Sequence, residues 1–348
     1  RPGAIDLVEP RGEIEFDNVI FRYPPASDSS VASLETPGGT SGDPDVDVLK
    51  GISLHVAAGE TVAVVGSSGS GKSTLAFAIS NLHGAPALIS EGEILFDNRD
   101  VLKMSPKALR KFRWNEASMV FQSAMNALNP VITIGAQITD VILAHKKVGF
   151  GEAWERGEAL LETVGIHCSR MTSYPHQLSG GMRQRVVIAI ALALRPRLII
   201  MDEPTTALDV VVEREIMDEL YALKKEFGFS ILFISHDLSL MGEIADRIGI
   251  MYAGRLVELG TSSEILSSPV HPYTKGLVAS FPTIHGPKVR LEGIPGNPPS
   301  LLDLPTGCAF AERCSQRTEI CGKAVPDLVP YGSRIAACHA LGPKESAA

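Results

Sequence analysis

A glycine-rich turn between an apolar strand and a helix constrains the fold of this 348-residue chain more than any other feature. Residues 66–73 read GSSGSGKS and follow directly on the run TVAVV at 61–65. They match the pattern G-x-x-x-x-G-K-[ST], in which backbone N–H groups and a helix N-terminus surround a chain of phosphates. Lys72 is then expected to contact the β and γ phosphates, and the Ser73 hydroxyl to bind Mg²⁺. A turn that binds nothing is disfavoured, because the strand and the helix that the motif requires are both predicted here.

Further apolar runs place this turn in an α/β domain. LIIM at 198–201 and ILFIS at 231–235 are candidates for core strands, and a long buried helix is predicted at 182–194. Strands that alternate with helices indicate a largely parallel sheet. Residues 13–23 alternate apolar and polar side chains and predict a strand, whereas 24–47, rich in Pro, Ser, Gly and Asp, predict a mobile loop.

Two carboxylates follow one of these predicted strands. Asp202 and Glu203 come directly after LIIM. An apolar strand that ends in a carboxylate puts Asp202 at the carboxyl edge of the sheet, where it can hold a magnesium shell. Glu203 is the candidate to polarise an attacking water. A lone Asp-Glu pair is more often structural, but beside a phosphate-binding loop we favour the functional interpretation.

A second helix start also has the chemistry of an anion site. Residues 178–184 read LSGGMRQ, so that Ser179, Gly180 and Gly181 open a predicted helix. One chain does not need two clamps for the same γ-phosphate. The simplest interpretation is that this helix start completes the nucleotide site of a second subunit.

The LSGGM pentapeptide, with the two motifs above, resembles the signature of the ATP-binding-cassette (ABC) ATPases, and the resemblance covers roughly residues 13–265. It implies that Gln122 senses magnesium and the γ-phosphate, that His236 is the switch histidine, and that Ala207-Leu208-Asp209 crosses the dimer interface. Tyr23 sits where the family places a ring against adenine, a plain strand-end tyrosine being the alternative. The resemblance implies Glu203, His236 and Gln122 as catalytic residues, and Ser73, Gln122 and Asp202 as magnesium ligands. The full nucleotide-binding set is Tyr23, Gly66, Ser67, Ser68, Gly69, Ser70, Gly71, Lys72, Ser73, Thr74, Gln122, Ser179, Gly180, Gly181, Asp202 and Asp209.

The C-terminal part of the chain indicates which group of ABC ATPases the sequence resembles. HPYTKGLVASFP at 271–282 and GIPGNPPSLLDLPTGCAFAERC at 293–314 resemble the ATPase subunits of oligopeptide and dipeptide permeases. The resemblance implies a peripheral ATPase on the cytoplasmic face of a bacterial membrane. Its partners would be two integral-membrane permease subunits, a second ABC ATPase (a copy or a paralogue) and an extracytoplasmic substrate-binding protein. Nickel and some oligosaccharide importers share this extension, so the cargo stays open.

Four cysteines gather near the C-terminus, at Cys308, Cys314, Cys321 and Cys338, whereas Cys168 stands alone and is expected to be a small buried hydrophobe. Disulfides are not expected in a chain that must meet cytosolic ATP. Structural zinc sites usually contain C-x2-4-C pairs, which are missing here, and the wider spacing favours a [4Fe–4S] cluster. Relatives of this tail are thought to carry one. Zn²⁺ and four packed thiols remain the alternatives, and loss of one cysteine should loosen the extension but leave the Lys72 and Glu203 chemistry intact.

Composition excludes some classes. The chain is 45% hydrophobic and 21% charged, with a net charge of -8 and a pI near 5.6, which argues against a nucleic-acid partner. The longest apolar run, 186–194, is too short for a membrane helix, so we expect a soluble intracellular chain. An ABC ATPase that acts on DNA or ribosomes is the rival class, but coiled-coil insertions or tandem cassettes are missing. An exporter ATPase would leave the cysteines unexplained.

The predicted organisation has two parts. Residues 1–267 form an α/β nucleotide-binding domain with a mainly parallel sheet, an N-terminal antiparallel β part and an inserted helical subdomain at about 123–180. Residues 268–348 form a small, extended cysteine-rich appendage.

Overall fold

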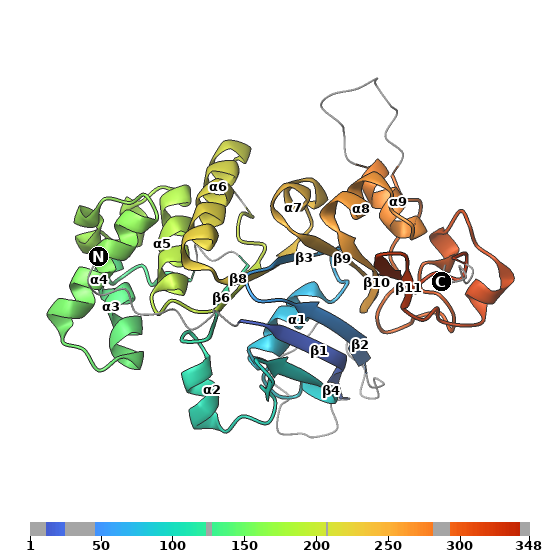
Figure 1. Ribbon diagram of the computed structural model, residues 1–348, viewed down its shortest axis with the longest axis horizontal. Coiled ribbons are helices and arrows are strands. Elements are labelled where there is room, and N and C mark those ends of the chain that lie inside the picture. The colour runs from blue at the N-terminus through green and yellow to red at the C-terminus, as the bar shows by residue number, and fades with distance from the viewer. Residues whose placement is uncertain (1–11, 25–45, 123–126, 207, 281–292, 342–348) are drawn as a thin grey trace. The chain divides into compact units, whose positions relative to one another are not determined.

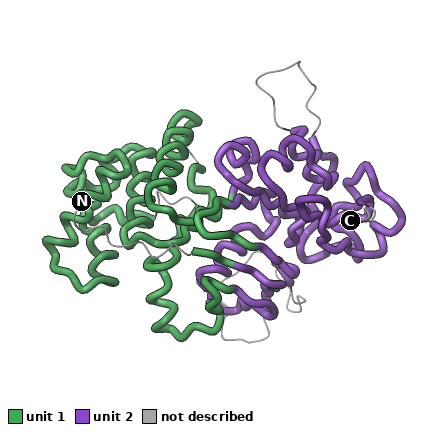
Figure 2. Tube along the Cα trace, viewed as in Figure 1, with its two compact units in different colours: residues 1–14, 55–61, 95–234 green, residues 15–54, 62–94, 235–348 purple. Residues whose placement is uncertain are grey.

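The computed structural model describes residues 12–24, 46–122, 127–206, 208–280 and 293–341. It divides into two compact units (Figure 2). Unit 1 comprises Arg1–Ile14, His55–Thr61 and Leu95–Ile234, and unit 2 comprises Glu15–Leu54, Val62–Ile94 and Ser235–Ala348. The loop predicted at 24–47 lies outside the described residues except at its ends.

Unit 1 is built on parallel strands whose side chains are buried on both faces. β7 (Leu198–Asp202) pairs in parallel with β6 (Ala117–Val120) and with β8 (Ser230–Ser235). Every residue of β7 and β8 is buried. Continuous apolar runs are typical of parallel strands covered on both sides, and the strand predictions at 198–201 and 231–235 are confirmed.

Helices make up most of the rest of unit 1 (Figure 1). The helix predicted at 182–194 begins two residues earlier, because the Ser179 hydroxyl accepts the Met182 N–H and caps it there. Within the region predicted as a helical subdomain, three segments pack on one another, namely α3 (Ile134–His145), α4 (Phe150–Thr163) and η2 (Cys168–Thr172). The other helical elements of unit 1 are α2 (Pro106–Phe112), η3 (Pro175–Gln177), α5 (Gly180–Leu192) and α6 (Val210–Phe227).

Unit 2 holds the glycine-rich turn and the C-terminal extension. Its strands β3 (Thr61–Val65) and β9 (Arg247–Tyr252) run parallel, and β10 (Arg255–Thr261) returns antiparallel to β9. Three neighbouring strands of a second sheet are, in order, β2 (Val46–Val56), β1 (Ile14–Tyr23), as predicted for 13–23, and β4 (Leu88–Phe96). The helices of unit 2 include α1 (Lys72–Ile79), α7 (Leu238–Ile244), α8 (Ser262–Ser267) and α9 (Pro272–Ala279).

The extension is less separate than its composition suggests. Residues 272–279, within the stretch after 268 where proline and glycine become frequent, form the helix α9, whose first three residues are buried. Farther on, β12 (Arg334–Ala336) pairs antiparallel with β10, and β11 (Val329–Tyr331) pairs with β12. Proline at the first position of α9 is compatible with a helix start, so a proline-rich composition does not exclude a helix here.

None of the helices in the described part of the chain combines the length and the apolar character needed to cross a membrane.

Candidate active site

The phosphate-binding loop lies between the buried strand β3 and the helix α1, in unit 2. Gly71 precedes α1 with a φ of 95°, in the left-handed region that glycine adopts without a steric penalty. Among the residues that the structure describes, no side chain caps α1. The N–H groups of its first turn therefore point from an uncapped helix start, which is the arrangement that binds phosphate oxygens.

Lys72 lies at the centre of this loop. Its side chain is 6% exposed, and its Nζ donates to the carbonyl oxygens of Gly66 (2.8 Å) and Ser67 (3.0 Å). The loop thus holds a nearly buried positive charge beside a helix N-terminus. Ser73 and Thr74, both half-buried, follow on α1, and Ser68 and Gly69 are exposed at the tip of the turn.

The other two site candidates of unit 2 are exposed. Tyr23 is the last residue of β1, is 43% exposed, and packs edge-on against Phe21 with ring centroids 5.6 Å apart. Its ring is therefore partly exposed, and the following residues 25–45 lie outside the described part. His236 is exposed directly after β8, and the next residue, Asp237, caps α7 by accepting the Leu240 N–H.

In unit 1 the structure brings Gln122 and Glu203 together. Gln122 Nε2 donates to Glu203 Oε2 at 2.9 Å, and Thr206 Oγ1 donates to the same oxygen at 3.2 Å. The Glu203 backbone has a φ of 45°, and its N–H donates to the Ile234 carbonyl at 2.8 Å. A left-handed glutamate is uncommon, and such backbone strain is concentrated at functional sites. Asp202, 1% exposed, ends β7 just before it.

Thr206 was not singled out from the sequence. Its position in the DEPTT segment, three residues after Glu203, was the available signal, because a hydroxyl at that spacing can reach back to the carboxylate.

Ser179 and Asp209 both cap helices of unit 1. Ser179, exposed, accepts the Met182 N–H at the start of α5, and Asp209, also exposed, accepts the Val212 N–H at the start of α6. A Cβ on Gly181 would come within 2.6 Å of a Val212 side-chain carbon, so the two helix starts lie against each other. Both predicted dimer motifs therefore present exposed helix N-termini. Ala207, in the second motif, lies outside the described residues.

The four clustered cysteines all belong to unit 2. The Cys308 N–H donates to the Cys321 carbonyl at 2.8 Å, and a Cβ on Gly307 would lie 2.2 Å from that same oxygen. Only glycine permits this close approach. Burial raises the pKa of the Cys308 thiol, and the electrostatic influence of Cys321, Cys338 and Cys314 raises it further.

Backbone N–H groups point at three of the four sulfurs. Such hydrogen bonds stabilise thiolate charge and are common around metal–thiolate centres. The donor and acceptor pairs are Phe310 with Cys308, Gln316 with Cys314, and Thr318 with Cys321. No three of the four sulfur atoms, all within the described residues, lie within 4.8 Å of one another.

Cys168 is not the buried hydrophobe that was expected. It is partly exposed on η2, its N–H donates to Glu162 Oε1 at 2.6 Å, and its sulfur lies 4.0 Å from His167 Nδ1. Its place at the start of a short surface helix, beside two polar side chains, explains the difference.

The match to known families agrees with this geometry. Residues 49–206 match the model of the ABC transporter family, and residues 257–321 match the family described as the oligopeptide/dipeptide transporter, C-terminal region. The chain is therefore an ABC-type ATPase.

Individual relatives define the class more closely. The chain is 46% identical to the oligopeptide transport ATP-binding protein OppD of Bacillus subtilis over 292 residues, 83% of this chain and 80% of that protein. It is 45% identical to the dipeptide transport ATP-binding protein DppD of Haemophilus influenzae, over 83% of this chain and 88% of that protein. The chain belongs to this family of ABC transporter ATP-binding proteins.

Solved structures show the same fold. The ATP-binding cassette MJ0796, a dimer in a post-hydrolysis state bound to ADP and Pi, superimposes with a TM-score of 0.60 at 29% identity. The match covers 72% of this chain and 98% of that chain. The cbiO1 protein from Clostridium perfringens, part of the ABC transporter complex cbiONQ, gives a TM-score of 0.59 at 27% identity.

Proposed function

We propose that this chain is the ATP-hydrolysing subunit of an importer for peptides. ATP binding would close two such ATPases head to tail, and hydrolysis would reopen them. Two integral-membrane permease subunits, contacting the helical subdomain, would convert this cycle into alternating access. An extracytoplasmic binding protein would deliver the peptide, and the chain would lie on the cytoplasmic face of the membrane. The support is the match along both the ATPase region and the C-terminal region.

The proposed chemistry divides the site residues by role. The loop 66–74 and Lys72 would bind the phosphates, and Ser73, Gln122 and Asp202 would hold Mg²⁺. Tyr23 would stack on adenine, and His236 would contact the γ-phosphate. The partner's nucleotide would receive Ser179, Gly180, Gly181 and Asp209.

Glu203 is proposed as the general base, and its contact with Gln122 is the observation that carries this assignment. A carboxylate that accepts hydrogen bonds from Gln122 and Thr206 has a fixed orientation, as a base that positions a water requires. Glu203→Gln should lower hydrolysis by about 10² or more and leave the nucleotide Kd nearly unchanged, because the substitution removes only the base. Lys72→Ala should weaken nucleotide binding itself. Normal turnover by Glu203→Gln would exclude Glu203 as the base.

The cargo is tested on the assembled transporter. ATPase activity of the reconstituted complex, with its binding protein, should rise with di- or oligopeptides and not with nickel chelates or oligosaccharides. Stimulation by one of the latter instead would replace the peptide assignment while leaving the ATPase assignment in place.

We propose a [4Fe–4S] cluster for the four cysteines, with zinc as the alternative. A single Zn²⁺ binds four sulfurs at about 2.3 Å, so that its ligands lie about 3.8 Å apart, whereas no three of the sulfurs here lie within 4.8 Å of one another. The N–H groups directed at three sulfurs fit a metal–thiolate centre of either kind. Protein purified without oxygen should contain about four irons and four sulfides per chain. One zinc without sulfide would establish the alternative, and neither metal would leave four packed thiols.

A further inference from the structure

The segment 270–273 is anchored by a fully buried carboxylate. Glu258 on β10 is 0% exposed, and its two oxygens accept the backbone N–H groups of Val270 (3.0 Å) and His271 (2.9 Å). Arg334 of β12 lies 3.5 Å from the same carboxylate. A strand of the C-terminal extension thus contributes to fixing the chain at the point where α9 begins.

His271 then sets the direction of α9. Its ring is buried, and its Nδ1 accepts the Tyr273 N–H at 3.1 Å, so the imidazole side chain caps the helix. Burial lowers the pKa of His271 to about 4, and the ring is therefore neutral and able to accept at physiological pH. Pro272 occupies the first helical position, where its missing N–H costs nothing.

Tyr273 reaches from α9 to the phosphate-binding loop. The side chain is 1% exposed, and its hydroxyl accepts the Ser67 N–H at 3.0 Å. The same peptide unit presents the Gly66 carbonyl to Lys72 Nζ at 2.8 Å. Because a peptide bond is planar, its N–H and C=O cannot rotate independently. The Tyr273 hydroxyl therefore restrains one side of the Gly66–Ser67 peptide plane, and Lys72 binds its other side.

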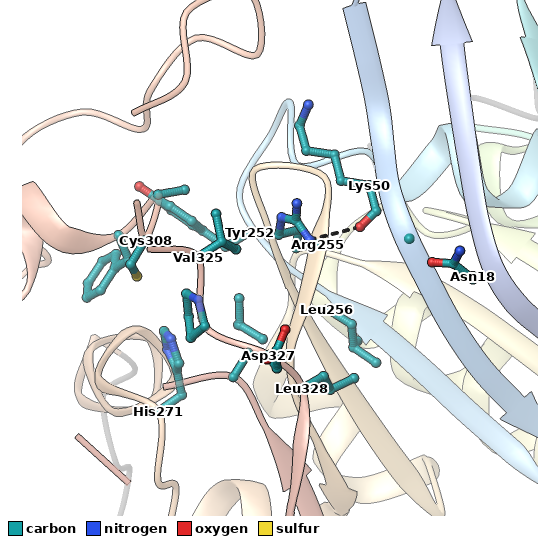
Figure 3. Close-up of a pocket in the computed structure, with 16 residues that line it drawn as sticks. Asn18, Lys50, Tyr252, Arg255, Leu256, His271, Cys308, Val325, Asp327 and Leu328 are labelled. Carbon is teal, nitrogen blue, oxygen red and sulfur yellow. Dashed lines mark hydrogen bonds between the residues drawn. The ribbon is translucent and has the colours of Figure 1, made fainter. Parts of the chain in front are cut away.

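A later part of the extension, around Phe310, packs against this tyrosine. The Phe310 ring, two residues after Cys308, lies 5.4 Å from both the Tyr273 and the Tyr252 rings, centroid to centroid. Arg313 Nη1 donates to the Tyr252 hydroxyl at 3.2 Å. Figure 3 shows Tyr252, His271 and Cys308 on the wall of one cavity of about 230 Å³.

We propose that Tyr273 is a positioning residue for nucleotide binding, and that Phe310 of the C-terminal extension holds it in place. The phenol keeps the Gly66–Ser67 peptide in the orientation that places Lys72 for the phosphates. The extension thereby supports the phosphate-binding loop within one unit of the chain. This inference rests on the proposed function of the loop.

Tyr252 provides a matched control. Its ring lies 4.6 Å from that of Tyr273, it is equally buried at 1% exposure, and its hydroxyl also accepts a hydrogen bond. That bond comes from Arg313 and not from the loop. Removing either hydroxyl disturbs the same aromatic cluster, but only Tyr273→Phe frees the Ser67 N–H.

The test is the affinity of the full chain for MgADP, measured by calorimetry. From the usual net contribution of one hydrogen bond, we expect Tyr273→Phe to raise the Kd for MgADP by about 2- to 10-fold. Tyr252→Phe should leave this Kd within about 1.5-fold of the wild-type value. Hydrogen exchange at the Ser67 N–H should be faster in Tyr273→Phe only. In the assembled transporter, kcat at saturating ATP should stay within about twofold, because the substitution affects binding of the phosphates and not the hydrolytic step. Phe310→Leu, which keeps an apolar side chain but loses the ring contacts, should raise the Kd in the same direction.

Equal Kd values for Tyr273→Phe and wild type would overturn the inference, and so would equal weakening by Tyr273→Phe and Tyr252→Phe. An unchanged Kd in Phe310→Leu would refute the role of the extension. Lys72→Ala separates these failures from failure of the proposed function, since a chain that binds MgADP normally without Lys72 does not use this loop for phosphate.

Discussion

Acidification should loosen α9 through a single histidine. Protonated His271 has no lone pair on Nδ1, so it cannot accept the Tyr273 N–H, and it would place a charge in a site that is 1% exposed. Burial is the main cause of its low pKa, and the nearby Lys275 ammonium lowers it further.

The size of the effect follows from the two pKa values. The pKa of an ordinary histidine is near 6.5, and that of His271 is lowered to about 4. This difference corresponds to about 3.4 kcal/mol of folding free energy, which is lost in full once the pH is well below 4. Between these values the unfolded chain binds the extra proton, and stability therefore falls as the pH falls. The contribution is fully present above pH 6.5, has decreased by about 2 kcal/mol at pH 5, and is lost as the pH passes through 4.

His271→Asn is the reference variant, because asparagine also caps helices with a side-chain acceptor but does not titrate. The free energy of opening of α9 is measured by native-state hydrogen exchange at pH 7 and pH 5 in both proteins. Other titrating groups act alike in both and cancel in the difference. The advantage of wild type over the variant should shrink by about 2 kcal/mol at pH 5. A pH-independent difference, or a His271 pKa of 6 or more by NMR, would refute the reasoning.

Ser179→Arg puts bulk and charge at the exposed start of α5 and should abolish ATP-dependent cross-linking of the two ATPase subunits, while the Kd of the isolated chain for ATP stays within about twofold. Ser179→Ala, which removes only the helix cap, is the control, and an equal loss of binding by the isolated Arg variant would contradict the head-to-tail arrangement. Gly307→Ala forces a Cβ against the Cys321 carbonyl and should speed hydrogen exchange across the extension by about tenfold. The control is Gly293→Ala, whose Cβ has no atom of the described residues within 4 Å. Similar exchange in these two glycine variants would show that the close approach is not required. Cys168→Ser should change neither the metal content nor the ATPase rate, since Cys168 belongs to unit 1, where its N–H donates to Glu162 and its sulfur lies near His167 Nδ1. Reduced iron or zinc would show that it is a ligand.

Much of the fold could be predicted because its signals are local. The continuous apolar runs that became β3, β7 and β8 can be read within five or six residues, and the loop around Lys72 follows from glycines and a helix start adjacent in sequence. Helix caps such as Ser179 and Asp209 are also local, since each bonds an N–H three residues ahead. Composition gave no such local signal for the helix at 272–279. Its start depends on a buried carboxylate 13 positions before His271, which accepts the His271 N–H.

The contacts that could not be predicted join residues far apart in the chain. Ser67 and Tyr273 are separated by 206 positions, and nothing in either neighbourhood indicates that a phenol meets a backbone N–H. The HPY tripeptide served only as a mark of resemblance. Its three residues have distinct physical roles, in which the histidine caps, the proline starts the helix and the tyrosine reaches the loop. Likewise, a lone cysteine is usually buried, and the neighbouring sequence does not indicate otherwise for Cys168. It lies at the surface because it begins a short helix beside Glu162.

These distant contacts also change what is expected of the four cysteines. From the sequence, loss of one cysteine should loosen the extension and leave the Lys72 chemistry intact. Phe310 follows Cys308 by two residues and packs on Tyr273, whose hydroxyl holds the peptide plane that binds Lys72. Loosening the cysteine loop therefore reduces the restraint on that plane. Even without the Tyr273 hydrogen bond, the Gly66–Ser67 peptide still binds Lys72. Loss of one cysteine should therefore raise the nucleotide Kd by no more than Tyr273→Phe does. The Gln122–Glu203 contact in unit 1 should be unchanged.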